Sequence, residues 1–299
     1  MNLKKPIGYS IVIVREMSKM KFHVIDQNYL RDNDLKKRII SSDPEEYFVV
    51  TDTALIEMMK YSKWQKISRN SLQIISEHPN KILVSESIPD LIREELSTKK
   101  TIGLFDLFSD NLTKAFRQYL LEFQRQGQSG ALHFDIAEAI KTERALLDRQ
   151  QLNHSQNLCK LQKGCKELKN ILDEESLKRA RNNKLTHDEL REIIAKPVVV
   201  LTASFLKENG FSKNEIYSFL LNNPFTFRFQ VAFTMLCLRW ISSGGVESLK
   251  ADKSTNEFMD MEYVLIASYG NSILSREPEV HKQLEDLHTI CSILNLNSI

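Results

Sequence analysis

The chain has 299 residues, of which 41 are basic and 39 acidic, so its small net charge does not identify a nucleic-acid partner, although a basic surface can still form locally. Its apolar fraction of 42% and charged fraction of 27% are those of a soluble globular protein with one large domain or two small ones. The four cysteines lack the CxxC spacing of a zinc site and suggest a cytoplasmic protein, and no stretch approaches the roughly 18 apolar residues of a membrane span.

The first third of the chain alternates between strand and helix patterns. Short apolar runs rich in β-branched residues predict strands at 22–25, 47–50 and 81–84. Helices are expected at 28–40, at 88–96 and directly after Thr51 or Asp52, either of which can cap a helix. Residues 1–19 are expected to be an N-terminal extension, either an upstream alternative start or an added strand.

The pattern becomes almost entirely helical between residues 99 and 255. Helices are predicted at 104–125, 131–151, 158–181, 189–195, 198–206, 212–221 and 225–241, with an interruption at Pro197 and a linker at 242–245. A helix at 258–269, a strand at 271–274 and a helix at 278–294 then restore the alternation. The sequence therefore predicts an α/β domain with a parallel sheet, built from residues 20–98 and 256–299 and interrupted by a helical insertion at 99–255.

Four acidic residues stand close to the predicted strands. Asp26 follows the first strand, and Glu57 lies one to two turns into the helix after the second. Asp260 is expected near the start of the helix before the last strand, and Glu277 follows that strand. Taken singly, such an aspartate is more often a helix cap and such a glutamate more often solvated, so the joint pattern carries the prediction.

Sites in a parallel sheet form beyond the carboxyl ends of its strands, where these carboxylates can converge. Carboxylates that meet repel one another unless a cation lies between them, and hard oxygen ligands suit Mg²⁺ or Mn²⁺. A pair of such ions can generate hydroxide from water and stabilise the leaving oxygen of a phosphodiester. The pattern therefore predicts a metal-dependent nuclease.

In these motifs the chain resembles the PIN-domain nucleases, a family that includes many ribonuclease toxins of bacterial toxin–antitoxin pairs. The segment from Val24 to Leu30 matches the first motif of the family, an apolar strand ending in Asp and followed by Asn. Glu57 matches the helical Glu of the second motif. The segment from Asn256 to Ala267 matches the third, with Glu257 in place of its first Asp, and Ser275 to Glu277 matches the fourth, with Glu in place of Asp.

The resemblance covers about residues 20–98 and 256–295 and includes two departures. Glu277 is one methylene longer than the usual Asp, and Asn271 stands where many members have another Asp. Either change could leave a one-metal site or reduced activity. The long helical insertion is also foreign to the small toxin members.

The resemblance implies a parallel sheet between helices and a Mg²⁺- or Mn²⁺-dependent endonuclease that usually acts on RNA through a metal-activated water, without a covalent intermediate. The implied catalytic and metal-binding residues are Asp26, Glu57, Asp260 and Glu277, with Glu57 acting directly or through water. Ser275 would orient the site by hydrogen bonding, Asn28 would support Asp26, and Asn271 is a further position beside the site.

The best basic patch runs from residue 178 to 184 and contains Lys178, Arg179, Arg181 and Lys184. Nucleic-acid phosphates require such charges, but a solvated helix end is the plainer alternative. A row of lysines at 160, 163, 166 and 169 could extend the patch. The aromatic run at 225–229 favours core or partner packing over base stacking.

Two functional hypotheses follow. The first is a metal-dependent endoribonuclease whose helical insertion selects RNA, binds an inhibitory or regulatory protein, or holds the enzyme inactive; a toxin or phage-defence role rests on family analogy alone. The second is a non-catalytic adaptor that acts through its helical region, and a DNA-directed nuclease is a weaker third. The sequence does not decide whether the protein forms a homo-oligomer. All nuclease interpretations require residues 22–25 and 271–274 to share one sheet.

Overall fold

The two ends of the chain meet in one parallel sheet. The computed structural model describes residues 20–59, 64–126, 154–181, 187–243, 250–270 and 272–293. Within them, β1 (Lys21–Ile25), β2 (Glu46–Val50), β3 (Ile82–Val84) and β4 (Ser272–Leu274) lie in the order β3-β2-β1-β4, all parallel. Val24 of β1 pairs with Ile273 of β4. The predicted α/β class and the shared sheet of the first and last strands are therefore confirmed.

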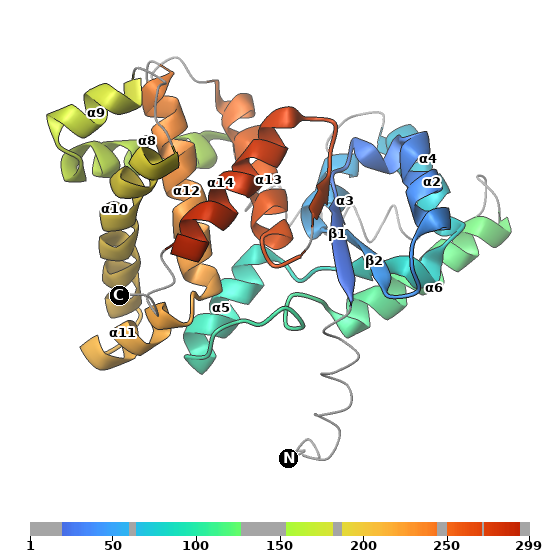
Figure 1. The fold of residues 1–299 in the computed structure, drawn as a ribbon. Helices are drawn as coiled ribbons and strands as arrows, with labels where there is room; N and C mark the ends of the chain where they lie inside the picture. The colour runs from blue at the N-terminus through green and yellow to red at the C-terminus, as the bar shows by residue number, and fades with distance from the viewer. Residues whose placement is uncertain are drawn as a thin grey trace.

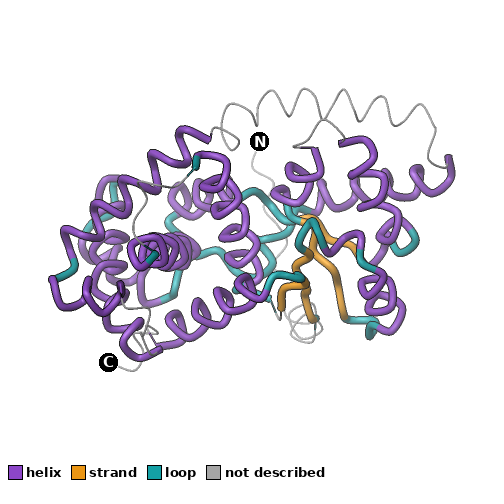
Figure 2. Tube along the Cα trace, turned by 90° about the horizontal axis from the view of Figure 1, so that it is seen from above, coloured by secondary structure: helices purple, strands orange, loops and turns teal. Residues whose placement is uncertain are grey.

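Helices lie on both sides of this sheet (Figures 1 and 2). On one side are α2 (Asn33–Ser41), α4 (Trp64–Ser76) and α6 (Asp110–Gln126), and on the other are α13 (Ala251–Ala267) and α14 (Pro278–Ile293). The connections contain η1 (Tyr29–Arg31), α3 (Asp52–Met59), η2 (Pro79–Lys81) and α5 (Ile88–Thr98). Because both faces are covered, the strands are mainly apolar toward their carboxyl ends, and Ile25, Val49 and Val50 are fully buried.

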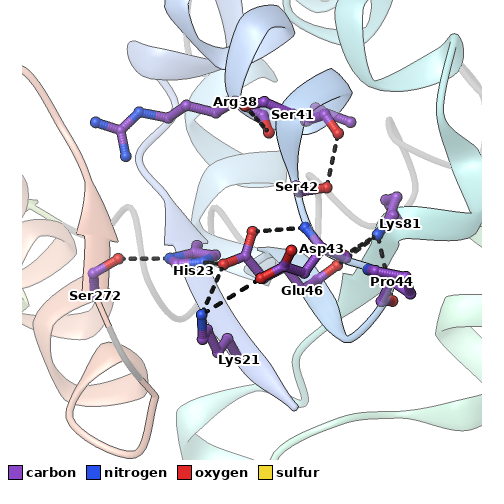
Figure 3. A network of polar contacts seen from close by, with 11 residues as sticks. Lys21, His23, Arg38, Ser41, Ser42, Asp43, Pro44, Glu46, Lys81 and Ser272 are labelled. Atoms are coloured by element: carbon purple, nitrogen blue, oxygen red, sulfur yellow. Dashed lines mark hydrogen bonds and ion pairs between the residues drawn. The ribbon is translucent and has the colours of Figure 1, made fainter. Parts of the chain in front are cut away.

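The amino ends of the strands carry a polar network, seen from close by in Figure 3. The His23 Nδ1 atom lies 2.7 Å from the Ser272 hydroxyl, which links β1 to β4. Lys21 pairs with Glu46 at 3.4 Å and links β1 to β2. Lys81 donates to the backbone carbonyl of Glu46, so β3 is held at the same edge. A different group of side chains lies at the opposite, carboxyl edge of the sheet.

The remaining helices gather beside α13 and α14 (Figure 1). They are α8 (His154–Ile171), α9 (Glu174–Arg181), α10 (His187–Glu208), α11 (Lys213–Leu221) and α12 (Phe225–Ser242). α12 is apolar on most sides and packs against α8, α9, α10, α13 and α14. The buried rings of Phe225 and Phe227 confirm core packing for the aromatic run. A Cβ atom at Gly164 would lie 2.6 Å from the Phe233 ring, so glycine permits the close approach of α8 to α12.

A buried carboxylate fastens α12 to the sheet domain. Glu95 of α5 is 0% exposed. Its Oε1 atom accepts the backbone N–H groups of Ile102 and Phe225, and its Oε2 atom accepts the N–H and the hydroxyl of Thr226. Phe225 and Thr226 begin α12, where free N–H groups and the helix dipole favour an anion. Burial raises the pKa of Glu95, and the four hydrogen bonds oppose that rise.

Two predicted helices in the middle region are wrong in their limits. The helix expected from residue 104 begins at Asp110, because the preceding backbone pairs with the end of β3: the N–H of Ser109 donates to the carbonyl of Val84 at 3.1 Å. The helix expected at 158–181 is two helices, α8 and α9. The Asp173 side chain accepts the N–H of Ser176 at 2.7 Å and caps the second.

Pro197 does not interrupt its helix, contrary to the sequence prediction. α10 continues through it from His187 to Glu208. A proline inside a helix removes one backbone hydrogen bond. The neighbouring residues Ile194 and Val198 are fully buried, and α10 packs against α12. Burial of this apolar face offsets the lost hydrogen bond.

The helix expected from residue 258 begins seven residues earlier, at Ala251. Its first two turns lack an apolar pattern, yet Ser254 and Thr255 are buried, and the Asn157 side chain donates to the Thr255 hydroxyl at 3.2 Å. The expected boundary between residues 255 and 256 therefore falls inside α13. The helix expected at 131–151 and the N-terminal segment 1–19 lie outside the described residues.

Candidate acidic active site

Asp26 is held at the carboxyl edge of the sheet by residues from two strands. Its backbone N–H continues the ladder to the carbonyl of Leu274 at 3.0 Å. Its Oδ1 atom accepts the backbone N–H of Asn28 at 3.1 Å, and its Oδ2 atom accepts the Ser275 hydroxyl at 2.8 Å. The same Ser275 oxygen accepts the N–H of Glu277 at 3.1 Å. One serine therefore joins the ends of β1 and β4.

Glu57 reaches this edge from α3. The Thr51 hydroxyl accepts the N–H of Ala54 at 3.1 Å, so Thr51 caps the helix directly after β2. The Glu57 Oε2 atom accepts the hydroxyl of Tyr263, which lies on α13, at 2.7 Å. A glutamate and a tyrosine that are 206 positions apart are thus in direct contact.

Asp260 shows that the four predicted carboxylates share one region. Burial, together with the negative charges of Glu277, Glu57 and Asp26, raises its pKa to about 7, while Arg239 opposes the rise. Asp260 lies in the middle of α13 and not near its start, because the helix begins at Ala251. The structure therefore brings together carboxylates from β1, α3, α13 and the end of β4.

A fifth carboxylate, Glu262, was missed in the sequence. Burial, together with the charges of Asp52 and Glu57, raises its pKa to about 8. Its Oε2 atom accepts the Thr53 hydroxyl at 2.6 Å. Lys160 of α8 opposes the rise in pKa, so the helical region contributes a positive charge close to the acidic group. No motif marks Glu262, because only the packing of α13 on α3 places it here.

The donor chemistry fits a hard divalent cation, since several carboxylates, most of them at least partly buried, repel one another at this edge. As the side chains stand, however, no group of three or more histidine, cysteine, aspartate or glutamate residues in the described part of the chain is arranged to hold a metal ion. Hydroxyl groups now satisfy an oxygen each of Asp26, Glu57 and Glu262. Coordination of a shared ion would require the carboxylates to draw closer.

The other predicted residues have different surroundings. The side-chain oxygen of Asn28 accepts a hydrogen bond from the guanidinium of Arg31 at 2.7 Å. Asn28 therefore supports Asp26 only through the hydrogen bond that its backbone N–H donates. Asn271 lies outside the described residues.

The predicted basic patch is described in part. Lys178 is exposed on α9, and Arg179 pairs with Glu189 at 3.7 Å. Arg181 ends α9 and its side chain is not among those described, while Lys184 lies outside the described residues altogether.

Comparison with family models, with curated proteins and with solved structures finds no match to this chain. Among the helices that the structure describes, none combines the length and the apolar character needed to cross a membrane.

Proposed function

We propose that this protein is a metal-dependent endonuclease that resembles the PIN-domain ribonucleases and hydrolyses phosphodiester bonds in RNA. The observation that carries the proposal is the convergence of Asp26, Glu57, Asp260 and Glu277 from four elements at the carboxyl edge of a parallel sheet. Asp26 is buried, Glu57 and Asp260 are partly buried, and Glu277 is exposed. Like charges gathered in this way destabilise a fold, and such groups are typical of functional sites.

Asp26, Asp260 and Glu277 would hold Mg²⁺ or Mn²⁺, with Glu57 as a further ligand or through water. The ion, when bound, supplies the Lewis acidity that activates water and stabilises charge on the leaving oxygen. Ser275 keeps Asp26 turned toward the edge of the sheet through its 2.8 Å hydrogen bond. A carboxyl group with a pKa of about 7, such as that of Asp260, can exchange a proton near neutral pH in the absence of an ion.

The helical region would bind the polynucleotide. Lys160 influences Glu262 electrostatically, and Lys163 and Lys166 are exposed on the same helix, α8. Phosphate groups of a bound strand are attracted by such a row of cations. Lys178 on α9 extends the exposed positive charge.

The test is cleavage of matched RNA and single-stranded DNA oligonucleotides with Mn²⁺, Mg²⁺ or EDTA. Wild type and Asp43→Asn, which alters an exposed aspartate at the opposite edge of the sheet, should cleave RNA only with metal. Asp26→Asn should not cleave. Cleavage of DNA but not RNA would show that DNA is the substrate. Cleavage by Asp26→Asn at the rate of wild type would overturn the proposal.

A second candidate is an inactive adaptor that acts through its helical region. The observation that favours it is that, as the side chains stand, no three histidine, cysteine, aspartate or glutamate residues among the described residues are placed to hold one metal ion. An adaptor without a metal site should show no Mn²⁺-dependent rise in melting temperature. The nuclease should show such a rise, and Asp26→Asn should lose it.

A further inference from the structure

We propose that Tyr263 is a positioning residue of the acidic site: its hydroxyl holds Glu57 in place for metal binding. This inference rests on the proposed function, because it assigns a role within the same site. The 2.7 Å hydrogen bond from the Tyr263 hydroxyl to the Glu57 Oε2 atom is its structural basis. No sequence motif indicated the residue.

The position of the phenol is fixed by the core. The Tyr263 side chain is 1% exposed and is among the largest fully buried side chains of the chain. Its ring therefore cannot change orientation without repacking α13 against the sheet. A donor on a rigid buried ring restricts its acceptor to one orientation, and such supporting partners of ligands are a general feature of metal sites.

The helix also links this donor to another carboxylate. Asp260 and Tyr263 are three residues apart on α13, so they share one face of the helix. Asp260 lies on that face, and Tyr263 on the same face holds Glu57 of α3 by its hydrogen bond. A single helix thus sets the relative positions of two carboxylates from different elements.

Repulsion makes such a donor necessary. Glu57 raises the pKa values of both Asp260 and Glu262, which shows that its charge lies close to theirs. Without a fixed donor, like charges would favour rotamers of Glu57 that point away from the site. A tyrosine hydroxyl is ordinarily protonated at physiological pH, so the phenol of Tyr263 acts as the donor in its 2.7 Å contact with Glu57.

The experiment compares Tyr263→Phe with Tyr269→Phe. Tyr269 is a matched control, because its buried hydroxyl lacks a hydrogen-bond partner within the described residues. Two readouts are recorded for each protein: the Mn²⁺ concentration that gives half of the full rise in melting temperature, and the Mn²⁺ dependence of RNA cleavage. Tyr263→Phe should raise both half-saturating concentrations roughly tenfold or more. Tyr269→Phe should match wild type.

A double variant identifies the route of the effect. If Tyr263 acts through Glu57, Tyr263→Phe should have no further effect on Mn²⁺ saturation in a Glu57→Gln background. Equal Mn²⁺ dependence of wild type and Tyr263→Phe would overturn the positioning role and leave the nuclease proposal intact. Absence of any Mn²⁺ effect on wild type would instead overturn the proposed function, and the positioning role with it.

Discussion

Two carboxylates at the edge of this sheet, Asp260 and Glu262, have surroundings that oppose their ionisation. Burial and three neighbouring acids raise the pKa of Asp260 to about 7. Burial and the charges of Asp52 and Glu57 raise that of Glu262 to about 8. A protein without a use for these charges would gain stability by replacing them, which is the usual relation between stability and activity at functional sites.

Asp260→Asn should therefore stabilise the metal-free protein. In EDTA at pH 8, the substitution removes a charge that its neighbours repel, and we expect the free energy of unfolding to rise by roughly 1–3 kcal/mol. Urea unfolding of both proteins measures the difference, with Asp43→Asn as an exposed control. With Mn²⁺ present, the difference in free energy of unfolding between the two proteins should shrink or change sign, because only wild type would retain the full set of ligands. A less stable Asp260→Asn in EDTA would refute the repulsion.

Some residues of the candidate site could be predicted from the sequence and others could not. Asp26 and Glu277 could be expected near one another because each directly follows a strand, and Glu57 because it lies in the helix after one. Asp260 was expected near the start of its helix and lies in the middle of α13. Glu262 and Tyr263 carry no such signal. Their roles depend on how α13 rotates against α3, which is set by tertiary packing.

Among the elements, α5 and α12 are joined by one side chain. Glu95 accepts hydrogen bonds from Ile102, Phe225 and Thr226, and so binds the start of α12 to the sheet domain. Glu95→Gln replaces one acceptor oxygen by an NH₂ group that faces these donors. We expect a loss of roughly 2–3 kcal/mol in the free energy of unfolding. The exposed neighbour Glu94→Gln should change it by less than about 0.5 kcal/mol. Similar losses in both variants would contradict the role of Glu95.

The pH dependence of this contact has a definite sign. Because burial raises the pKa of Glu95 above its ordinary value, the native state holds the proton more tightly than the unfolded state. The stabilisation from this group is thus fully present below its ordinary pKa and falls as pH rises through the native value. The stability advantage of wild type over Glu95→Gln should decrease as pH rises from about 4.5. An advantage that grows with pH would show that the native pKa is lowered instead.

The ends of helices and strands could be predicted where the local sequence determines them, but not where contacts with distant helices do. The apolar runs of β1, β2 and β3 were identified because buried parallel strands are apolar on both faces. The start of α13 at Ala251 and the passage of α10 through Pro197 were missed. Both depend on contacts with distant helices, α8 in one case and α12 in the other.

For the whole molecule, the sheet order β3-β2-β1-β4 is the feature on which the proposed site depends. It places the last strand beside the first, and so brings Ser275 within 2.8 Å of Asp26 across 249 positions of sequence. The strand and helix alternation at the two ends allowed this closure to be predicted. The packing of the helices between them on α13 and α14 could not be, since no periodicity specifies which helices meet.

The central claim is that the acidic edge of the sheet binds a divalent cation. Calorimetric titration of Mn²⁺ into the metal-free wild type and into Asp26→Asn tests it most directly. We expect saturable binding to wild type that is weakened roughly tenfold or more in the variant. Binding of equal strength to both proteins, or no binding to wild type, would contradict it.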